Sequence, residues 1–301
     1  MLPEADSDAG SSRPLADERG SSTANWRQRV RPARFTPGLG VLVATLIYAA
    51  YSVFLTWPLA SHPGGLLSGV GVSGDLGGSV SQVGYVVQHH IFPFLPATFH
   101  GLDAPEALQQ AWVENLSGLP SNTLLFGLGY IFGAVAGSNI FLWLSYVMSG
   151  LSIFLLTRRL FANFGAALLA GFAFAFFPWA VDKLNGHYQY MDGWVLVLGV
   201  WRMLVLADRP TIRNALIGGA AVAFGMWWTP YFILIGGVGF VVMEVVVLAT
   251  GFLRRQLWPA LRGAVVAGVP IVVLFGALGV LAVLAGGSQT GSVRAQSIQD
   301  L

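Results

Sequence analysis

Residues able to do acid–base chemistry gather in one polar stretch, residues 61–138, which follows the first long apolar block. The stretch holds four carboxylates and four of the five histidines, and it contains no lysine or arginine. Carboxylates and imidazoles are the side chains that most often move protons in catalysis. A polar segment this long between two apolar blocks is uncommon unless it has a function of its own. The acids are Asp75, Asp103, Glu106 and Glu114, and the histidines are His62, His89, His90 and His100.

Asp75 is the carboxylate whose surroundings most resemble a reaction site. Glycines stand on both sides of it, and glycines let a substrate approach the backbone closely. The alternative is that Asp75 only caps a short helix in a glycine-rich turn. The histidines do not favour a metal site, because the adjacent His89 and His90 would point in different directions on a helix and the spacing matches no standard ligand pattern.

A second polar group lies farther along the chain. Asp182, Lys183 and His187 stand close to Asp192 in a short segment between apolar blocks, and Arg294 lies near the C-terminus. We expect all of them on the same membrane face as the acidic stretch. His187 is either a hydrogen-bond donor to substrate or a solvated residue at a helix end. Lys183 and Arg294 are the only cations expected on this face, and each is either a partner for a phosphate or an ordinary surface charge.

The elements that must position these residues are apolar. Hydrophobic residues make up 55% of the chain, charged residues 10%, and the mean hydropathy is +0.66, whereas soluble domains contain roughly 25% charged residues. The apolar residues form long blocks, which favours lipid as the solvent. The sequence therefore predicts an all-α, polytopic membrane helix bundle. The absence of cysteine excludes disulfides and thiolate metal sites, and no basic surface indicates a nucleic-acid partner.

The chain divides into five predicted regions. Residues 1–36 lack large apolar side chains and are expected to form a disordered cytoplasmic tail. A first transmembrane helix follows over 37–60, and then an outer loop over 61–138 with short interfacial or re-entrant helices. Within that loop, 80–88 and 105–115 are expected to be short amphipathic helices. A six-helix transmembrane region is predicted over 139–286, and 287–301 would begin a second outer loop.

The distribution of cations predicts the orientation. The block 121–137 is short and holds four glycines, and counting it as a span would move later arginine pairs to the wrong face. We therefore expect it to lie at the outer interface or to re-enter the membrane. With about seven spans, 14 of the 16 lysines and arginines fall in the tail or on the cytoplasmic side. This predicts a multi-pass protein of the plasma (inner) membrane with a cytoplasmic N-terminus.

Several short motifs occur in a characteristic order after the first span: Ser73-Gly74-Asp75, Leu102-Asp103-Ala104-Pro105-Glu106, Gly137-Ser138-Asn139 and Arg158-Arg159. This order resembles the C-type (GT-C) membrane glycosyltransferases. The segment 166–174, which leads to Pro178 and then to Asn185-Gly186-His187, resembles the bacterial branch of that class. The resemblance covers about residues 38–301.

The resemblance implies that a sugar is moved from a polyprenyl-phosphate-linked donor to an acceptor at the outer membrane face of the cell envelope. Asp75 matches the catalytic base of that class, and a divalent cation held by Asp75 and the donor phosphate is left open. The implied partners are the lipid bilayer and the lipid-linked donor. The candidate substrate-binding residues are His187, Lys183, Asp182, Glu114 and Arg294.

Other functions remain open at this point. Members of the class usually have more spans, so we expect either a fragment or a second chain that supplies the missing helices. The alternative functions are a non-catalytic transporter, a lipid-handling scaffold or a degenerate glycosyltransferase subunit. A transporter is expected to show charged residues at mid-membrane or repeats with broken helices, and the sequence shows neither clearly. Glu244 lies inside a predicted span and is either functional or close enough to the headgroups to reach them.

Overall fold

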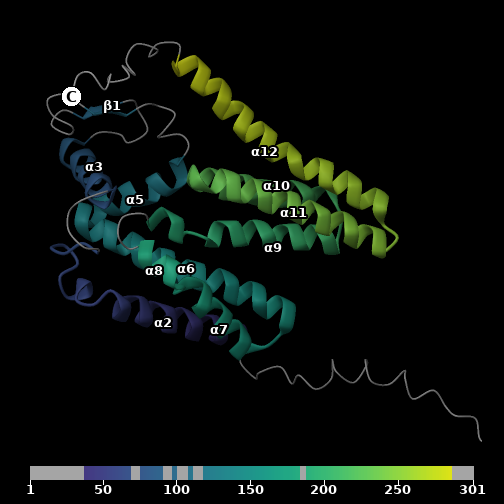
Figure 1. Cartoon of the computed structure of the whole chain (residues 1–301), viewed down its shortest axis with the longest axis horizontal. Helices are drawn as coiled ribbons and strands as arrows, with labels where there is room; N and C mark the ends of the chain where they lie inside the picture. The colour runs from purple at the N-terminus through teal and green to yellow at the C-terminus, as the bar shows by residue number, and fades with distance from the viewer. Residues whose placement is uncertain are drawn as a thin grey trace, which may run out of the picture.

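The computed structural model describes residues 37–68, 75–90, 97–99, 108–110, 118–183 and 188–286. The predicted tail (1–36) and second outer loop (287–301) lie outside the described residues. Long helices run side by side and their connections alternate between two ends of the bundle (Figure 1). They are α2 (Pro37–Leu55), α6 (Ala134–Phe161), α7 (Phe164–Ala175), α9 (Trp194–Asp208), α10 (Ile212–Trp228), α11 (Tyr231–Leu253) and α12 (Leu257–Gly286).

The two ends of the bundle differ in character. One carries the connections α6–α7, α9–α10 and α11–α12, which are rich in arginine; we call it the arginine end, at the right of Figure 1. The opposite end carries the segment after α2, the connection from α7 to α9 and the α10–α11 turn; we call it the loop end. The short elements lie at the loop end: η2 (Leu59–Ser61), α3 (Asp75–His89), β1 (Ala97–Phe99), β2 (Leu108–Gln110), α5 (Leu119–Phe132), α8 (Pro178–Asp182) and η4 (Tyr188–Met191).

Among the described residues, four helices are long and apolar enough to cross a membrane: Gly38–Leu55, Ala134–Phe161, Tyr231–Leu253 and Leu257–Leu281. Their outer faces carry large apolar side chains, such as Leu234 and Val272, which are 76% and 72% exposed. Exposing so many apolar side chains of one bundle to water would be energetically costly, whereas contact with lipid is not. This pattern is typical of a helical membrane protein.

The predicted number of about seven spans is not confirmed. The helices α7, α9 and α10 have 12, 15 and 17 residues, fewer than the roughly 20 needed to cross the hydrocarbon core. Within the six-helix region predicted over 139–286, the apolar run 163–181 is split because Pro178 begins a new helix, α8, and the residue before a proline avoids the helical conformation. The next helix begins only at Trp194, because the residues before it form the η4 turn.

The polar stretch 61–138 is more structured than its prediction. The helix α3 covers the expected 80–88 segment. The prediction of a helix over 105–115 is wrong for Leu108–Gln110, which form strand β2. This strand pairs antiparallel with β1. The helix α6 begins at Ala134, five residues before the predicted start at 139, after a sharp turn at Gly133 whose φ of 87° suits glycine.

The helix α5 returns along α6 in a tight contact. A Cβ atom at Gly137 would lie 2.6 Å from the backbone nitrogen of Gly129, so the two helices touch backbone to backbone. With 14 residues, α5 is shorter than a membrane span. It packs instead against α3 and α6 at the loop end.

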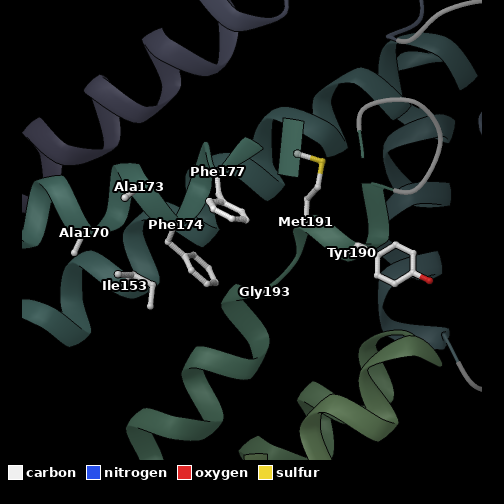
Figure 2. Close-up of a pocket in the computed structure, with 8 residues that line it drawn as sticks. All are labelled: Ile153, Ala170, Ala173, Phe174, Phe177, Tyr190, Met191 and Gly193. Atoms are coloured by element: carbon white, nitrogen blue, oxygen red, sulfur yellow. The ribbon is translucent and has the colours of Figure 1, made fainter. Parts of the chain in front are cut away.

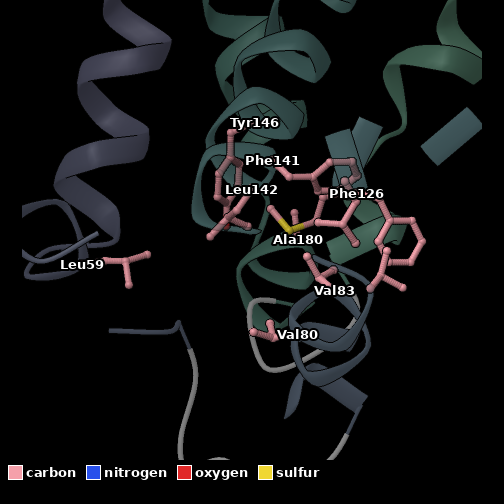
Figure 3. Packing of buried hydrophobic residues seen from close by; sticks show 11 residues of the cluster. Leu59, Val80, Val83, Phe126, Phe141, Leu142, Tyr146 and Ala180 are labelled. Atoms are coloured by element: carbon pink, nitrogen blue, oxygen red, sulfur yellow. The ribbon is translucent and has the colours of Figure 1, made fainter. Parts of the chain in front are cut away.

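The helix α6 organises the core at the loop end. Its residues Phe141, Leu142 and Tyr146 are at most 1% exposed, and they form one cluster with residues of η2, α3, α5, α8 and η4 (Figure 3). Figure 3 labels Val83 of α3 and Ala180 of α8 in this cluster. The helix that Asp75 begins is thus packed into the same core as α8 and η4.

Candidate functional site

A cavity of about 440 Å³ lies where α6, α7 and η4 meet the start of α9 (Figure 2). Among the described lining residues Tyr190 alone has a polar side chain, so these walls suit a hydrocarbon chain rather than a sugar or a charged group. The lining residues are Ile153 of α6, Ala170, Ala173 and Phe174 of α7, and Phe177, Tyr190, Met191 and Gly193 from the segment that leads into α9. We call this cavity the apolar groove.

One wall of the apolar groove depends on a glycine. A Cβ atom at Gly193 would lie 2.8 Å from Cζ of Phe174, so a larger residue there would push the aromatic ring aside. Tyr190 stacks on Tyr231 of α11, with ring centroids 4.3 Å apart. The segment between η4 and α9 therefore joins the groove to the α10–α11 turn.

Asp192 is a buried carboxylate directly behind that wall. It is 1% exposed, lies in the connection between η4 and α9, and accepts a hydrogen bond from Nε1 of Trp228 at 2.8 Å. Trp194 also contributes a side-chain hydrogen bond to it, and Ser145, whose hydroxyl donates to the backbone carbonyl of Phe141, lies beside it. Burial raises the pKa of Asp192 to about 6, and these polar neighbours counteract part of the rise. The carboxylate thus links α6, α9 and α10 beside the groove.

The segment is fixed to α6 at a second point. The hydroxyl of Ser149 donates a hydrogen bond of 2.6 Å to the backbone carbonyl of Met191, which lines the groove. Ser149 is 2% exposed, so this bond is protected from water. Together with Asp192, this bond fixes the backbone that forms one wall of the apolar groove.

We expect Asp192 to make the stability of the protein depend on pH. Because its pKa rises from 3.8 to about 6 on folding, the folded state binds more protons than the unfolded state between these values. The contribution of Asp192 to stability is then greatest below about pH 4 and falls by up to about 3 kcal/mol as pH rises through 6. In Asp192→Asn this fall should disappear, as measured by unfolding of the detergent-solubilised protein at pH 4 to 7.5. An identical pH profile in wild type and variant would contradict this assignment.

The predicted site residues are only partly described by the structure. Asp75 is the first residue of α3, and its side chain lies outside the described residues. Asp182 and Lys183 meet at the end of α8, where Nζ lies 3.3 Å from Oδ2. His187, Glu114 and Arg294 lie outside the described residues.

Two of the predicted histidines have neighbours in the described part of the chain. His89 packs on Tyr85 with ring centroids 4.2 Å apart, and Nδ1 of His62 lies 2.9 Å from the hydroxyl of Ser61. Within the described ranges, no three His, Cys, Asp or Glu residues gather closely enough to hold a metal ion. A cation at Asp75 would be held by a side chain outside the described residues.

Glu244 differs from the expectation that it reaches the headgroups. It lies in α11, and both of its carboxyl oxygens are buried without a hydrogen-bond partner in the described part of the chain. A buried carboxyl group without partners is costly. The structure therefore does not support contact between Glu244 and the headgroup region.

Sequence reasoning missed the two features that define this site. Asp192 was visible only as an acid near His187, because its burial depends on Trp228, which lies 36 residues away. The apolar groove is formed by residues of ordinary apolar type, and no local pattern separates them from residues that face lipid. The one available signal was an acid placed directly before the Gly193-Trp194 start of an apolar helix.

Comparisons of the chain with protein-family models, with curated proteins and with solved structures found no match. The resemblance to GT-C glycosyltransferases thus stays a prediction from the motifs. The site itself consists of an apolar groove, a buried carboxylate behind it and an ion pair on α8.

Proposed function

We propose that this protein is a membrane glycosyltransferase that takes a sugar from a polyprenyl-phosphate-linked donor and passes it to an acceptor. The observation that carries the proposal is the apolar groove, whose volume of about 440 Å³ lies within the roughly 300–1,000 Å³ usual for small-molecule sites. A hydrocarbon chain is the part of such a donor that an apolar wall would bind. The loop end would face away from the cytoplasm of a plasma (inner) membrane, where lipid-linked sugars are used.

In this proposal the polar residues of the loop end act on the donor head. Asp75 removes the proton of the acceptor hydroxyl as the hydroxyl oxygen bonds to the anomeric carbon, the bond from that carbon to the phosphate oxygen breaks, and polyprenyl phosphate leaves. Lys183 and Arg294 pair with the phosphate. Asp182, His187 and Glu114 bind sugar hydroxyls. The proposal that these residues act at one place beside the groove is supported by packing. Residues of α3 and α8 belong to one packed cluster with Met191, which lines the groove.

A second candidate is a lipid-handling scaffold without catalysis. None of the groove-lining residues that the structure describes carries a charge at neutral pH, so this lining alone would explain lipid binding and no more. The two candidates share the groove and differ in the role of Asp75. A chain that binds the lipid-linked donor but never releases the sugar would fit the scaffold.

The role of the apolar groove in donor binding can be tested by filling the groove with a large side chain. We expect Ala173→Trp to reduce the binding of a photoreactive polyprenyl-phosphate probe at least 10-fold, because the indole would occupy the space of the hydrocarbon chain. Leu169→Trp is the matched control, since Leu169 lies on the same helix, does not line the groove and is 69% exposed. Cross-linking of the probe to purified protein in nanodiscs measures both. Equal labelling of the two variants would remove the groove from the proposed function.

A further inference from the structure

The arginine end has one carboxylate at its centre. Asp208, the last residue of α9, accepts hydrogen bonds from Nη2 of Arg159 at the end of α6 and from Nη2 of Arg254 after α11, each at 3.1 Å. Nη1 of Arg254 also donates to the backbone carbonyl of Asp208 at 3.2 Å. This acid therefore holds the α6–α7, α9–α10 and α11–α12 connections together.

The cations at this end far outnumber that carboxylate. Seven arginines and one aspartate of the described residues lie here, a formal charge of +6. Most of these guanidinium groups are on exposed residues, and no carboxylate besides Asp208 pairs with them in the described part of the chain. The seven are Arg158, Arg159, Arg209, Arg213, Arg254, Arg255 and Arg262.

Large apolar side chains are exposed around the same arginines. Phe161 is 64% exposed, Leu253 is 80% exposed and Trp258 is 67% exposed. Each lies in or next to one of the three connections. Pairing of arginines with the carboxylates of a soluble protein or with the phosphates of a nucleic acid does not itself require exposed apolar side chains. A bilayer interface suits both the arginines and the exposed apolar side chains, because apolar side chains enter the acyl region while arginines reach the lipid phosphates.

One arginine already shows how a guanidinium is held at this boundary. Arg158 lies over the ring of Phe154, with Cζ 5.6 Å from the ring centroid. Its Nη1 reaches the first turns of α2, where a Cβ atom at Gly40 would lie 2.6 Å from it. The cation thus lies on an aromatic face between α2 and α6 and donates to no carboxylate in the described residues.

We propose that the arginine end is a binding surface for anionic phospholipids, with exposed guanidinium groups such as those of Arg213 and Arg262 pairing with lipid phosphates. The surface lies opposite the loop end, so this property does not depend on the glycosyltransferase proposal. Guanidinium groups match the phosphate diester by two parallel hydrogen bonds. Anionic lipid then supplies the countercharge that the described part of the chain provides only through Asp208.

The test uses the full chain, purified in a neutral detergent, and a fluorescent phosphatidylglycerol as the probe. We expect the chain to bind phosphatidylglycerol at least 10-fold more tightly than phosphatidylcholine, and the double variant Arg213→Gln/Arg262→Gln to lose at least 5-fold of that affinity. The matched control Arg213→Lys/Arg262→Lys keeps the positive charge and should retain most of the affinity for phosphatidylglycerol. Equal affinity for the two lipids, or no loss in the glutamine variant, would overturn the proposal.

A second variant separates lipid binding from folding. Asp208→Asn removes the central carboxylate. It should therefore lower the stability of the protein in neutral detergent and yet raise its affinity for phosphatidylglycerol. A purely structural role for the arginines predicts that both quantities fall together, which would contradict the proposal. Displacement of the lipid probe by millimolar inorganic phosphate or by a short RNA, at constant ionic strength, would assign the surface to those ligands and also overturn it.

Discussion

Asp75→Asn should lower sugar transfer from a polyprenyl-phosphate-linked donor at least 100-fold and leave membrane insertion intact. The expected size follows from general base catalysis, which contributes about 10²–10⁴-fold. Asparagine has nearly the same size and shape as aspartate, and Asp75 is the first residue of α3. The substitution therefore preserves the start of the helix and removes only the basic group. The measurement is release of labelled sugar by purified protein in nanodiscs.

The matched control for that experiment is Asp103→Asn, which removes another carboxylate of the same polar stretch. We expect this control to keep wild-type transfer. Full transfer by Asp75→Asn would exclude Asp75 as the base. Donor binding without transfer by the wild type, with every polyprenyl donor tried, would favour the lipid-handling scaffold instead.

Gly171→Leu should destabilise the bundle by at least about 3 kcal/mol, at the upper end of the usual effect of overpacking a core. A Cβ atom at Gly171 would collide with the hydroxyl of Tyr48 and with the backbone carbonyl of Gly150. The backbone of α6 cannot move aside easily, and the Tyr48 hydroxyl is fixed by its hydrogen bond of 3.0 Å to the carbonyl of Leu168. Unfolding of the protein in mixed micelles, followed by circular dichroism, measures the loss.

Gly165→Leu is the control, because Gly165 lies on the same helix and its Cβ would meet only the side chain of Asn163, at 3.7 Å. Leucine is a better helix former than glycine, so this variant should be as stable as the wild type or slightly more stable. If both variants unfolded alike, the close contact between α2, α6 and α7 would be disproved. A stable Gly171→Leu protein would have the same meaning.

The helical architecture could be predicted from the sequence because it depends on local properties. The break between α10 and α11 is an example, since α10 ends at Trp228, α11 begins at Tyr231 and Thr229-Pro230 stands between them. The number of spans could not be predicted from hydropathy, because the mean hydropathy of a segment does not show where its helix ends. The helix break at Pro178 lies inside a continuous apolar segment. Strand β2 was missed for a related reason: its residues pair with β1, which lies about ten residues earlier.

The candidate site was harder to predict than the fold. The apolar groove and the burial of Asp192 arise from contacts between α6, α7, α9 and α10, which no local pattern encodes. The sequence did place Asp182 and Lys183 at one end of the bundle, and the structure joins them as an ion pair. The role of Asp75 rests on the order of motifs and stays a prediction.

The proposed reaction requires the loop end to face away from the cytoplasm, and the chain is suited to a direct test because it contains no cysteine. Single cysteines can be placed at Gly64, an exposed residue at the loop end, and at Gln256, an exposed residue at the arginine end. A membrane-impermeant maleimide should label Gly64→Cys in intact cells and Gln256→Cys only after permeabilisation. The opposite pattern would contradict the orientation and, with it, transfer at the outer membrane face.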